Sequence, residues 1–263
     1  MSEPHRARRR FGQNFLVDGN IIRKIVAAIA PRPGEMIVEI GPGLAALTRP
    51  VLEACGRLHV VEIDRDLIAR LKSDFGDGRL TIHEGDALKF DFATLGSDLR
   101  VIGNLPYNIS TPLLFHLSDH AERIRDMTFM LQKEVVDRMV AGPATEAYGR
   151  LSVMLQYRHE MEKLFDVPPG AFRPAPKVTS AIVRLVPRPA SALRAHDAAL
   201  LGRIVTAAFG QRRKTLRNTL REFAGEAELA ALGIDAGLRG ERLSVDDFVR
   251  IANHCAGRSE AGA

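Results

Sequence analysis

The sequence predicts an α/β protein, with a doubly wound, mostly parallel sheet of seven strands followed by a small all-α domain. Three observations carry this prediction. Up to about residue 149, short apolar runs alternate with amphipathic segments, which is typical of βαβ units in a sheet covered on both faces. Two more apolar runs then follow one another with no long helix between them. Beyond residue 196 every strong pattern is helical.

The predicted strands are short apolar runs that end at turn residues. They are expected at residues 36–40, 57–63, 79–87, 99–104, 126–132, 151–160 and 180–187. Apolar residues recur at helical spacing in the intervening segments. Helices are therefore expected at residues 20–30, 47–55, 64–75, 111–120 and 133–141. The Pro-rich segment 167–178 forms a loop between the last two strands, so these two strands should end the sheet as a hairpin-like pair.

The chain divides into two domains at the linker candidate 187–196. Residues 1–187 form the α/β body with an N-terminal arm, and residues 188–263 form the helical domain. An apolar stripe from Leu200 to Phe209 predicts one helix of the second domain. Near the end of the chain, Ser244 and Asp247 have the spacing of a helix-capping box.

Composition narrows the class of protein. The net charge of +5 and the pI of about 9.5 favour a polyanionic partner. Cys55 and Cys255 are each isolated, which fits a reducing cytoplasm without a disulfide framework. The histidines show no metal-ligand spacing, so no metal is expected. No apolar run approaches the roughly 20 residues that span a bilayer.

A cofactor site is predicted where the first strand ends. Gly41 and Gly43 allow a sharp turn and a close approach of backbone to ligand. Glu62 ends the second strand 19 residues after Gly43, the distance at which doubly wound folds place an acid on a ribose hydroxyl. A dinucleotide and S-adenosylmethionine (SAM) both fit these features, as does a plain tight turn. Asp86 after the third strand suits an adenine or an Asx turn, and Pro42 crowds the approach of a pyrophosphate, so SAM is favoured.

The stretch Asn104-Leu105-Pro106-Tyr107, at the end of the fourth strand, suits methyl transfer to an adenine N6. The Asn104 side chain and the Leu105 main chain each offer a carbonyl that can accept an N6–H bond and stabilise developing positive charge. Pro106 stiffens the turn, and Tyr107 offers a stacking face for an extruded base. Phe172 is the candidate for the second stacking face, with plain core packing as the alternative.

With these motifs in place, the chain resembles the rRNA adenine N6,N6-dimethyltransferases, most closely the bacterial small-subunit (KsgA/RsmA) type. The resemblance runs through nearly the whole chain. Its motifs are FGQNFL (11–16), EIGPG (39–43), VEID (61–64), EGDAL (84–88), GNLPYNISTPLLF (103–115), FRPAPKVTSA (172–181), FGQRRKTLRNTL (209–220) and ERLSVDDFVRIAN (241–253).

The resemblance implies a SAM-dependent enzyme, a methyltransferase of Rossmann-like fold that acts in ribosome biogenesis and rRNA processing. It would place two methyls on each of two adjacent adenines in a hairpin loop near the 3′ end of 16S rRNA, within the immature 30S subunit. It also implies a cytoplasmic location, and a monomer is expected. The residues implied to hold SAM are Asn14, Leu16, Gly41, Glu62, Asp86 and Asn104.

The same resemblance assigns the target adenine to Asn104, Leu105 and Tyr107, with Phe172 as the second stacking partner. It makes residues 13–16 a lid over cofactor and substrate. One departure is Ala45, where the family usually has a further glycine. The added methyl would tighten the space near the cofactor, at small cost because the helix is expected to have begun there.

A basic helix is predicted at residues 209–223, with an apolar face opposite a row of arginines. The candidates for RNA contact are Arg212, Arg213, Lys214 and Arg217, and the alternative is a solvated face. Four other functions stay open. They are an Erm-type 23S rRNA dimethyltransferase, a DNA adenine methyltransferase, a dehydrogenase, and a largely non-catalytic ribosome assembly factor.

Overall fold

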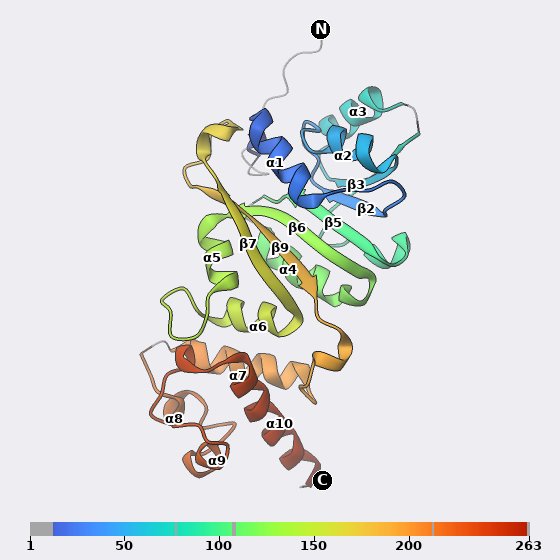
Figure 1. Cartoon of the computed structure of the whole chain (residues 1–263). Coiled ribbons are helices and arrows are strands. Elements are labelled where there is room, and N and C mark those ends of the chain that lie inside the picture. The colour runs from blue at the N-terminus through green and yellow to red at the C-terminus, as the bar shows by residue number, and fades with distance from the viewer. Residues whose placement is uncertain (1–12, 77, 107–108, 212, 262–263) are drawn as a thin grey trace. The chain divides into compact units, whose positions relative to one another are not determined.

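The chain folds around one seven-stranded sheet in the order β4-β3-β2-β5-β6-β9-β7, seen in the computed structural model of Figure 1. The structure describes residues 13–76, 78–106, 109–211 and 213–261. The strands of this sheet are β2 (Ile37–Ile40), β3 (Leu58–Glu62), β4 (Leu80–Glu84), β5 (Leu99–Asn104), β6 (Ile124–Gln132), β7 (His159–Val167) and β9 (Ser180–Pro187). Strands β2 to β6 are parallel, and β9 runs antiparallel to β6. A second, two-stranded sheet joins β1 (Phe15–Leu16) to β8 (Phe172–Arg173).

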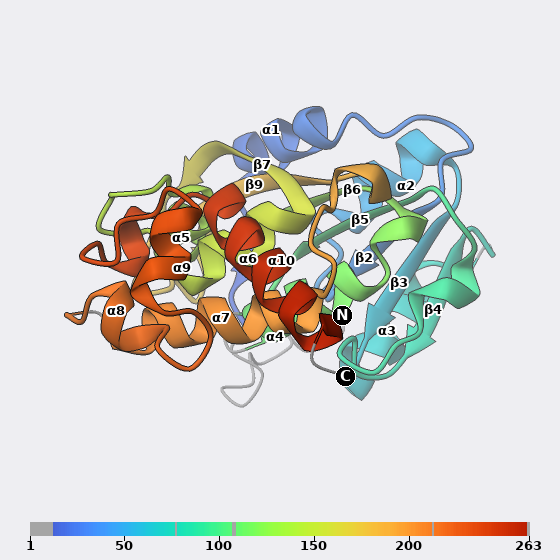
Figure 2. The same ribbon diagram turned by 90° about the horizontal axis from the view of Figure 1, so that it is seen from below.

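The helices predicted before and between the strands of the parallel part, and after its last strand, all form. They are α1 (Gly19–Ile29), α2 (Thr48–Cys55), α3 (Arg65–Asp74), α4 (Ser110–Asp119) and α5 (Lys133–Val140). Helices α1 and α2 lie on one side of the sheet and α4 lies on the other (Figures 1 and 2). The first group buries Ile25, Ile29, Val51 and Leu52 against sheet residues, which include Ile37. This doubly wound arrangement confirms the predicted fold class.

The prediction that residues 151–160 form a strand is wrong. This segment is helix α6 (Arg150–Arg158), and the strand β7 begins only at His159. Leu151, Val153, Leu155 and Tyr157 are buried, which gives an alternation like that of a strand, but Ser152 between them is buried too. A helix covered around most of its circumference loses the clean helical pattern, so periodicity alone cannot distinguish it from a strand. The predicted pairing at the end of the sheet holds for β7 and β9.

The chain forms two compact units, and the second takes in more than the C-terminal segment. One unit comprises Met1–Val136 and Met161–Pro187, and the other comprises Asp137–Glu160 and Arg188–Ala263. The break at residue 187 matches the predicted linker, while residues 137–160 were expected in the α/β body. They belong with the helical unit because α6 contributes Val153 and Tyr157 to its core.

The helical unit also contains α7 (Ala198–Gly210), α8 (Leu216–Thr219), α9 (Glu226–Ala231) and α10 (Val245–Ala261). The predicted apolar stripe of α7 is buried from Leu200 to Ala208. The predicted capping box forms, because the Ser244 amide donates to Asp247 Oδ2 at 2.8 Å and the Asp247 amide donates to Ser244 Oγ at 3.1 Å. Across the described ranges, no helix is both long enough and apolar enough to cross a membrane.

Candidate active site

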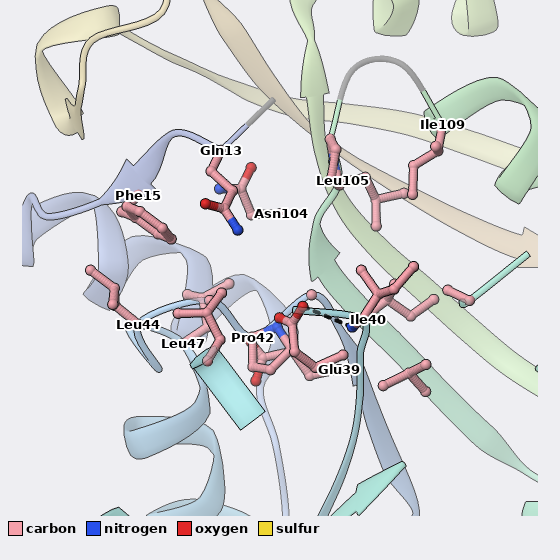
Figure 3. Close-up of a pocket in the computed structure, with 18 of the residues that line it drawn as sticks. Gln13, Phe15, Glu39, Ile40, Pro42, Leu44, Leu47, Asn104, Leu105 and Ile109 are labelled. Carbon is pink, nitrogen blue, oxygen red and sulfur yellow. Dashed lines mark hydrogen bonds between the residues drawn. The ribbon is translucent and has the colours of Figure 1, made fainter. Parts of the chain in front are cut away.

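A cavity of about 220 Å³ opens where the parallel strands end, at the point where the strand order reverses between β2 and β5. Ligands of open α/β sheets bind at this switch point. The cavity brings together all the residues predicted to hold the cofactor, which come from five segments far apart in the chain. Figure 3 shows this cavity, with Asn104 labelled among them. These residues are Asn14, Leu16, Gly41, Glu62, Asp86 and Asn104.

The glycine turn forms the floor of the cavity. Gly41 and Gly43 have φ values of 66° and 57°, which a side chain disfavours. The Gly41 amide donates to the Val61 carbonyl at 2.9 Å, so the turn is fixed to β3. A Cβ at position 43 would lie 3.3 Å from Phe15 Cδ1, because the arm passes closely over the turn. The turn therefore offers a bare backbone to a ligand from one side and contacts the arm on the other.

Ala45 differs from its prediction in two respects. Helix α2 begins at Thr48, so residue 45 still belongs to the turn and not to the helix. Its φ is 65°, a conformation that costs a residue with a Cβ roughly 1 kcal/mol. Its neighbours Leu44 and Ala46 line the cavity while Ala45 does not, so its methyl does not narrow the cofactor space.

Glu62 and Asp86 stand at the ends of neighbouring strands. Glu62 Oε1 accepts the Ile63 and Asp64 amides, both at 2.9 Å, and burial raises the pKa of this carboxyl. Asp86 Oδ1 accepts the Leu88 amide at 3.0 Å. This hydrogen bond forms the Asx turn that the sequence offered as the alternative to adenine binding. Both side chains line the cavity as well, so each combines a local structural role with exposure to a ligand.

Glu39 and Ile63 are among the cavity residues that sequence reasoning missed. Glu39, inside β2, is 2% exposed, and its Oε2 has no hydrogen-bond partner among the described residues. Burial, with a contribution from the Glu62 carboxylate, raises the pKa of Glu39 to about 7. In the sequence, the signal for Glu39 is a single acidic residue within an apolar strand. Ile63 is 48% exposed at the cavity, and its signal was an apolar residue directly after the predicted ribose-binding acid.

Asn104 and Leu105 line the cavity at the end of β5. The Asn104 amide donates from Nδ2 to the Asn14 carbonyl at 3.1 Å, and the Leu105 amide donates to Met130 at 3.2 Å. Gly103, just before them, pairs with Ile40 of β2, and a Cβ there would lie 2.6 Å from the Ile40 carbonyl oxygen. Only glycine lets the two strands approach this closely. Tyr107 lies outside the described residues.

Phe172 is placed with the core and not at the cavity. Its side chain is 1% exposed, and its backbone pairs with Leu16 between β8 and β1. It packs in the same apolar cluster as Ile25, Ile102 and Ile182. The structure therefore shows the core-packing alternative for this ring: Phe172 lies beside Leu16 but does not line the cavity.

The predicted basic helix does not form as one element. Helix α7 ends at Gly210, and α8 covers only Leu216–Thr219. The helix is interrupted because the Leu216 and Arg217 amides donate to Leu238 and Ala236, at 2.8 and 2.9 Å, instead of to a preceding turn. Arg213 and Lys214 lie in the connection between the helices, and Arg217 forms an ion pair with Glu226 at 2.6 Å. Arg212 lies outside the described residues.

Among the residues that the structure describes, no group of three or more His, Cys, Asp or Glu is arranged to hold a metal ion. Cys55 and Cys255 are both free and buried.

Comparisons with known proteins all find enzymes that methylate ribosomal RNA. A family model described as "Ribosomal RNA adenine dimethylase" matches residues 4–256. A protein of Aromatoleum aromaticum named "Ribosomal RNA small subunit methyltransferase A" is 73% identical over 98% of this chain and 97% of its own length. A protein of the same name from Thiobacillus denitrificans is 62% identical over 97% of this chain and 100% of its own length.

Two solved structures share the fold over nearly the whole chain. A dimethyladenosine transferase from Plasmodium falciparum has a TM-score of 0.81 at 24% identity, covering 93% of this chain and 98% of its own. The 23S rRNA methyltransferase ErmE has a TM-score of 0.73 at 25% identity, covering 92% of this chain and 100% of its own.

Proposed function

Because the chain belongs to the ribosomal RNA adenine dimethylase family, we propose that it dimethylates N6 of two adjacent adenosines in the hairpin loop near the 3′ end of 16S rRNA. The family match confirms the resemblance seen in the sequence, and the protein is a SAM-dependent methyltransferase of rRNA. The small-subunit target is supported by relatives of 73% and 62% identity that are named for it, against 25% for the 23S enzyme. The dehydrogenase and DNA methyltransferase readings have no such support.

The cavity residues fit SAM. The bare glycine turn at Gly41 lets a ligand approach the backbone, and the Glu62 and Asp86 carboxylates at neighbouring strand ends suit hydrogen bonds from a ribose and an adenine. Ile63 offers an exposed apolar side chain beside Glu62 for an adenine face. We assign the six cavity residues named above to SAM on this basis.

The transfer chemistry follows from two carbonyl groups at the end of β5. SAM supplies an electrophilic methyl group on a sulfonium. The Asn104 side-chain oxygen and the Leu105 main-chain oxygen accept the two N6–H bonds of the target adenine, which holds its lone pair toward that methyl. As nitrogen becomes positive, the two fixed dipoles stabilise it, and the extra proton then leaves to water. A single observation carries the proposal: both residues border the same cavity as the cofactor residues.

A flipped base also needs stacking surfaces, and we assign these to Tyr107 and Phe172 by resemblance. An aromatic surface is worth on the order of 1–3 kcal/mol per base. For Phe172 this role requires the 1% exposed ring to be uncovered when RNA binds.

The test is Asn104→Ala, which removes one of the two acceptors. We expect a fall in methyl transfer of 10²-fold or more, the rough value of one such dipole. RNA binding should stay largely intact, as should SAM binding, because the other five residues assigned to SAM remain. The assay incubates radiolabelled SAM with undermethylated 30S particles and, separately, with 50S particles, and maps the labelled nucleotides in both rRNAs. The matched control is Asn20→Ala, an exposed amide on α1. A normal rate for Asn104→Ala contradicts the catalytic assignment, and label in 23S rRNA alone contradicts the target.

We also propose that Arg212, Arg213, Lys214 and Arg217 contact rRNA phosphates from the connection after α7 and from α8. Phosphate contacts give affinity that weakens with salt, so removing two arginines should reduce the salt slope of binding by about 2. The double variant is Arg213→Ala with Arg217→Ala. Its charge-matched control is Arg203→Ala with Arg239→Ala, both exposed in the same unit. Equal salt slopes in the two variants contradict this assignment.

We assign the catalytic role to residues 1–187 and rRNA engagement to residues 188–263. The setting we propose is the immature 30S subunit in the cytoplasm, with the protein acting as a monomer.

A further inference from the structure

The arm, residues 13–18, lies across the cavity and is held firmly at one end. Phe15 and Leu16 pair with β8, and the Val17 amide donates to the Ala171 carbonyl at 2.8 Å. Gln13 and Asn14 extend beyond this pairing and still line the cavity. Gln13 is labelled in Figure 3. Their position therefore depends on contacts other than the small sheet.

One such contact joins Gln13 to a rigid acceptor. Gln13 Nε2 donates to Asp64 Oδ2 at 3.0 Å. Asp64 is 1% exposed, its Oδ1 accepts the Asp66 amide at 3.1 Å at the start of α3, and its amide donates to Glu62 at 2.9 Å. The acceptor is thus fixed both to the helix that follows it and to the predicted ribose-binding acid. We call this Gln13–Asp64 hydrogen bond the latch.

The neighbouring residue of the arm sets the orientation of an amide in the active site. Asn104 Nδ2 donates to the Asn14 carbonyl at 3.1 Å. A main-chain carbonyl can only accept, so the NH₂ group of Asn104 must be the end that faces it. The Asn104 side-chain oxygen is then turned away from Asn14, and its direction depends on where the arm is held.

We propose that Gln13 is a positioning residue for methyl transfer: the latch holds the Asn14 carbonyl against Asn104 and so fixes the direction of the Asn104 side-chain oxygen. The inference rests on the role of Asn104 proposed above. Because the latched arm borders the cavity from Gln13 to Leu16, the same hydrogen bond slows the exit of the demethylated product, S-adenosylhomocysteine.

The test exchanges donor and acceptor across the latch. Gln13→Glu places two carboxylates face to face, whereas Gln13→Glu with Asp64→Asn restores a hydrogen bond in the opposite direction. Asp64→Asn alone should be mild, because the Gln13 amide can rotate to accept and Asn also caps helices well. For Gln13→Glu we expect kcat to fall by on the order of tenfold or more and product release to speed up, since a hydrogen bond to a charged group is lost. The double variant should recover most of both.

The control is Arg49→Ala, which removes an exposed ion pair to Asp74, 2.8 Å long, in the same unit. Thermal unfolding of every variant shows whether it folds. Recovery of kcat and of product release in the double variant, at equal unfolding midpoints, supports the latch. If Gln13→Glu has the wild-type kcat and the wild-type rate of product release, the latch is wrong. It is also wrong if kcat falls only in step with the unfolding midpoint and the double variant does not recover it.

Failure of the latch can be told from failure of the catalytic assignment by running Asn104→Ala in the same series. If Asn104→Ala is inactive and Gln13→Glu is normal, only the latch is wrong. If Asn104→Ala keeps the wild-type rate, the catalytic assignment is wrong and the latch falls with it.

Discussion

The two ends of the parallel sheet both bury charged groups, but they treat them in opposite ways. At the amino end, Arg100 donates to Asp126 at 2.9 and 3.1 Å, to Glu35 at 2.7 Å and to the Ile29 carbonyl at 2.6 Å. At the carboxyl end, Glu39 keeps an oxygen with no hydrogen-bond partner among the described residues. The same sheet thus pairs Arg100 with two carboxylates at one end and leaves an oxygen of Glu39 without a partner beside the cavity.

The pKa shifts of Arg100 and Glu39 reflect this difference between the two ends of the sheet. Burial opposes the charge of Arg100, but hydrogen bonds to Asp126 and Glu35 outweigh it, so the pKa of the guanidinium is raised and the charge is stabilised. Burial raises the pKa of Glu39 to about 7 with too little compensation, so its charge is destabilised. A fully satisfied network stabilises a fold, whereas an unsatisfied group in a site is available to a ligand.

The largest effect is expected from breaking the amino-end network with Asp126→Ala. Asp126 is 3% exposed and also accepts from Arg184 at 2.8 Å, so its loss leaves buried positive charge without its main partner. We expect a loss of about 3–5 kcal/mol in the free energy of unfolding, measured by urea denaturation. Asp98→Ala is the control, because Asp98 pairs with Arg125 in the same network but is exposed. Equal denaturation midpoints for the two variants would mean that the buried Asp126 stabilises the fold no more than the exposed Asp98, which contradicts the stabilising role given to the amino-end network.

A smaller, pH-dependent effect is expected from Glu39→Gln. The folded-state pKa of about 7 lies above the ordinary 4.5, so between these values the folded protein binds more protons than the unfolded chain and loses stability as pH rises. From pH 5 to pH 8, the wild type should lose up to about 3 kcal/mol relative to Glu39→Gln.

The measurement for Glu39 is urea unfolding at several pH values, with Glu53→Gln as an exposed control on α2. Parallel stability curves for wild type and Glu39→Gln would mean that burial does not destabilise the charged form of Glu39.

The sequence predicts the α/β body well because local signals and tertiary structure agree there. Each parallel strand is a short apolar run that ends at a polar or glycine residue, so Gly41, Glu62, Asp86 and Asn104 could be assigned to one edge of the sheet from the sequence alone. The amino-end network could not be assigned, because nothing local indicates that Glu35, Arg100 and Asp126 meet.

The helical unit was harder for a physical reason. Helix α6 is buried around most of its surface, which hides its period, and the helix expected at residues 209–223 is broken by backbone hydrogen bonds to Ala236 and Leu238. Such long-range backbone partners leave no periodic trace in the sequence. The arginines there were found as a basic cluster, but their arrangement was not.

Gly103 allows β5 and β2 to approach each other closely beside the proposed active site. It lies opposite Ile40, and any side-chain carbon there would come closer to the Ile40 oxygen than contact permits. Gly41 follows Ile40 and Asn104 follows Gly103, so a side chain at position 103 would shift the turn proposed to hold SAM relative to the amide proposed to orient the target adenine. Misplacement by about 1 Å can cost 10²-fold in rate. The spacing of these two groups therefore depends on the absence of a Cβ at position 103, although Gly103 itself does not line the cavity.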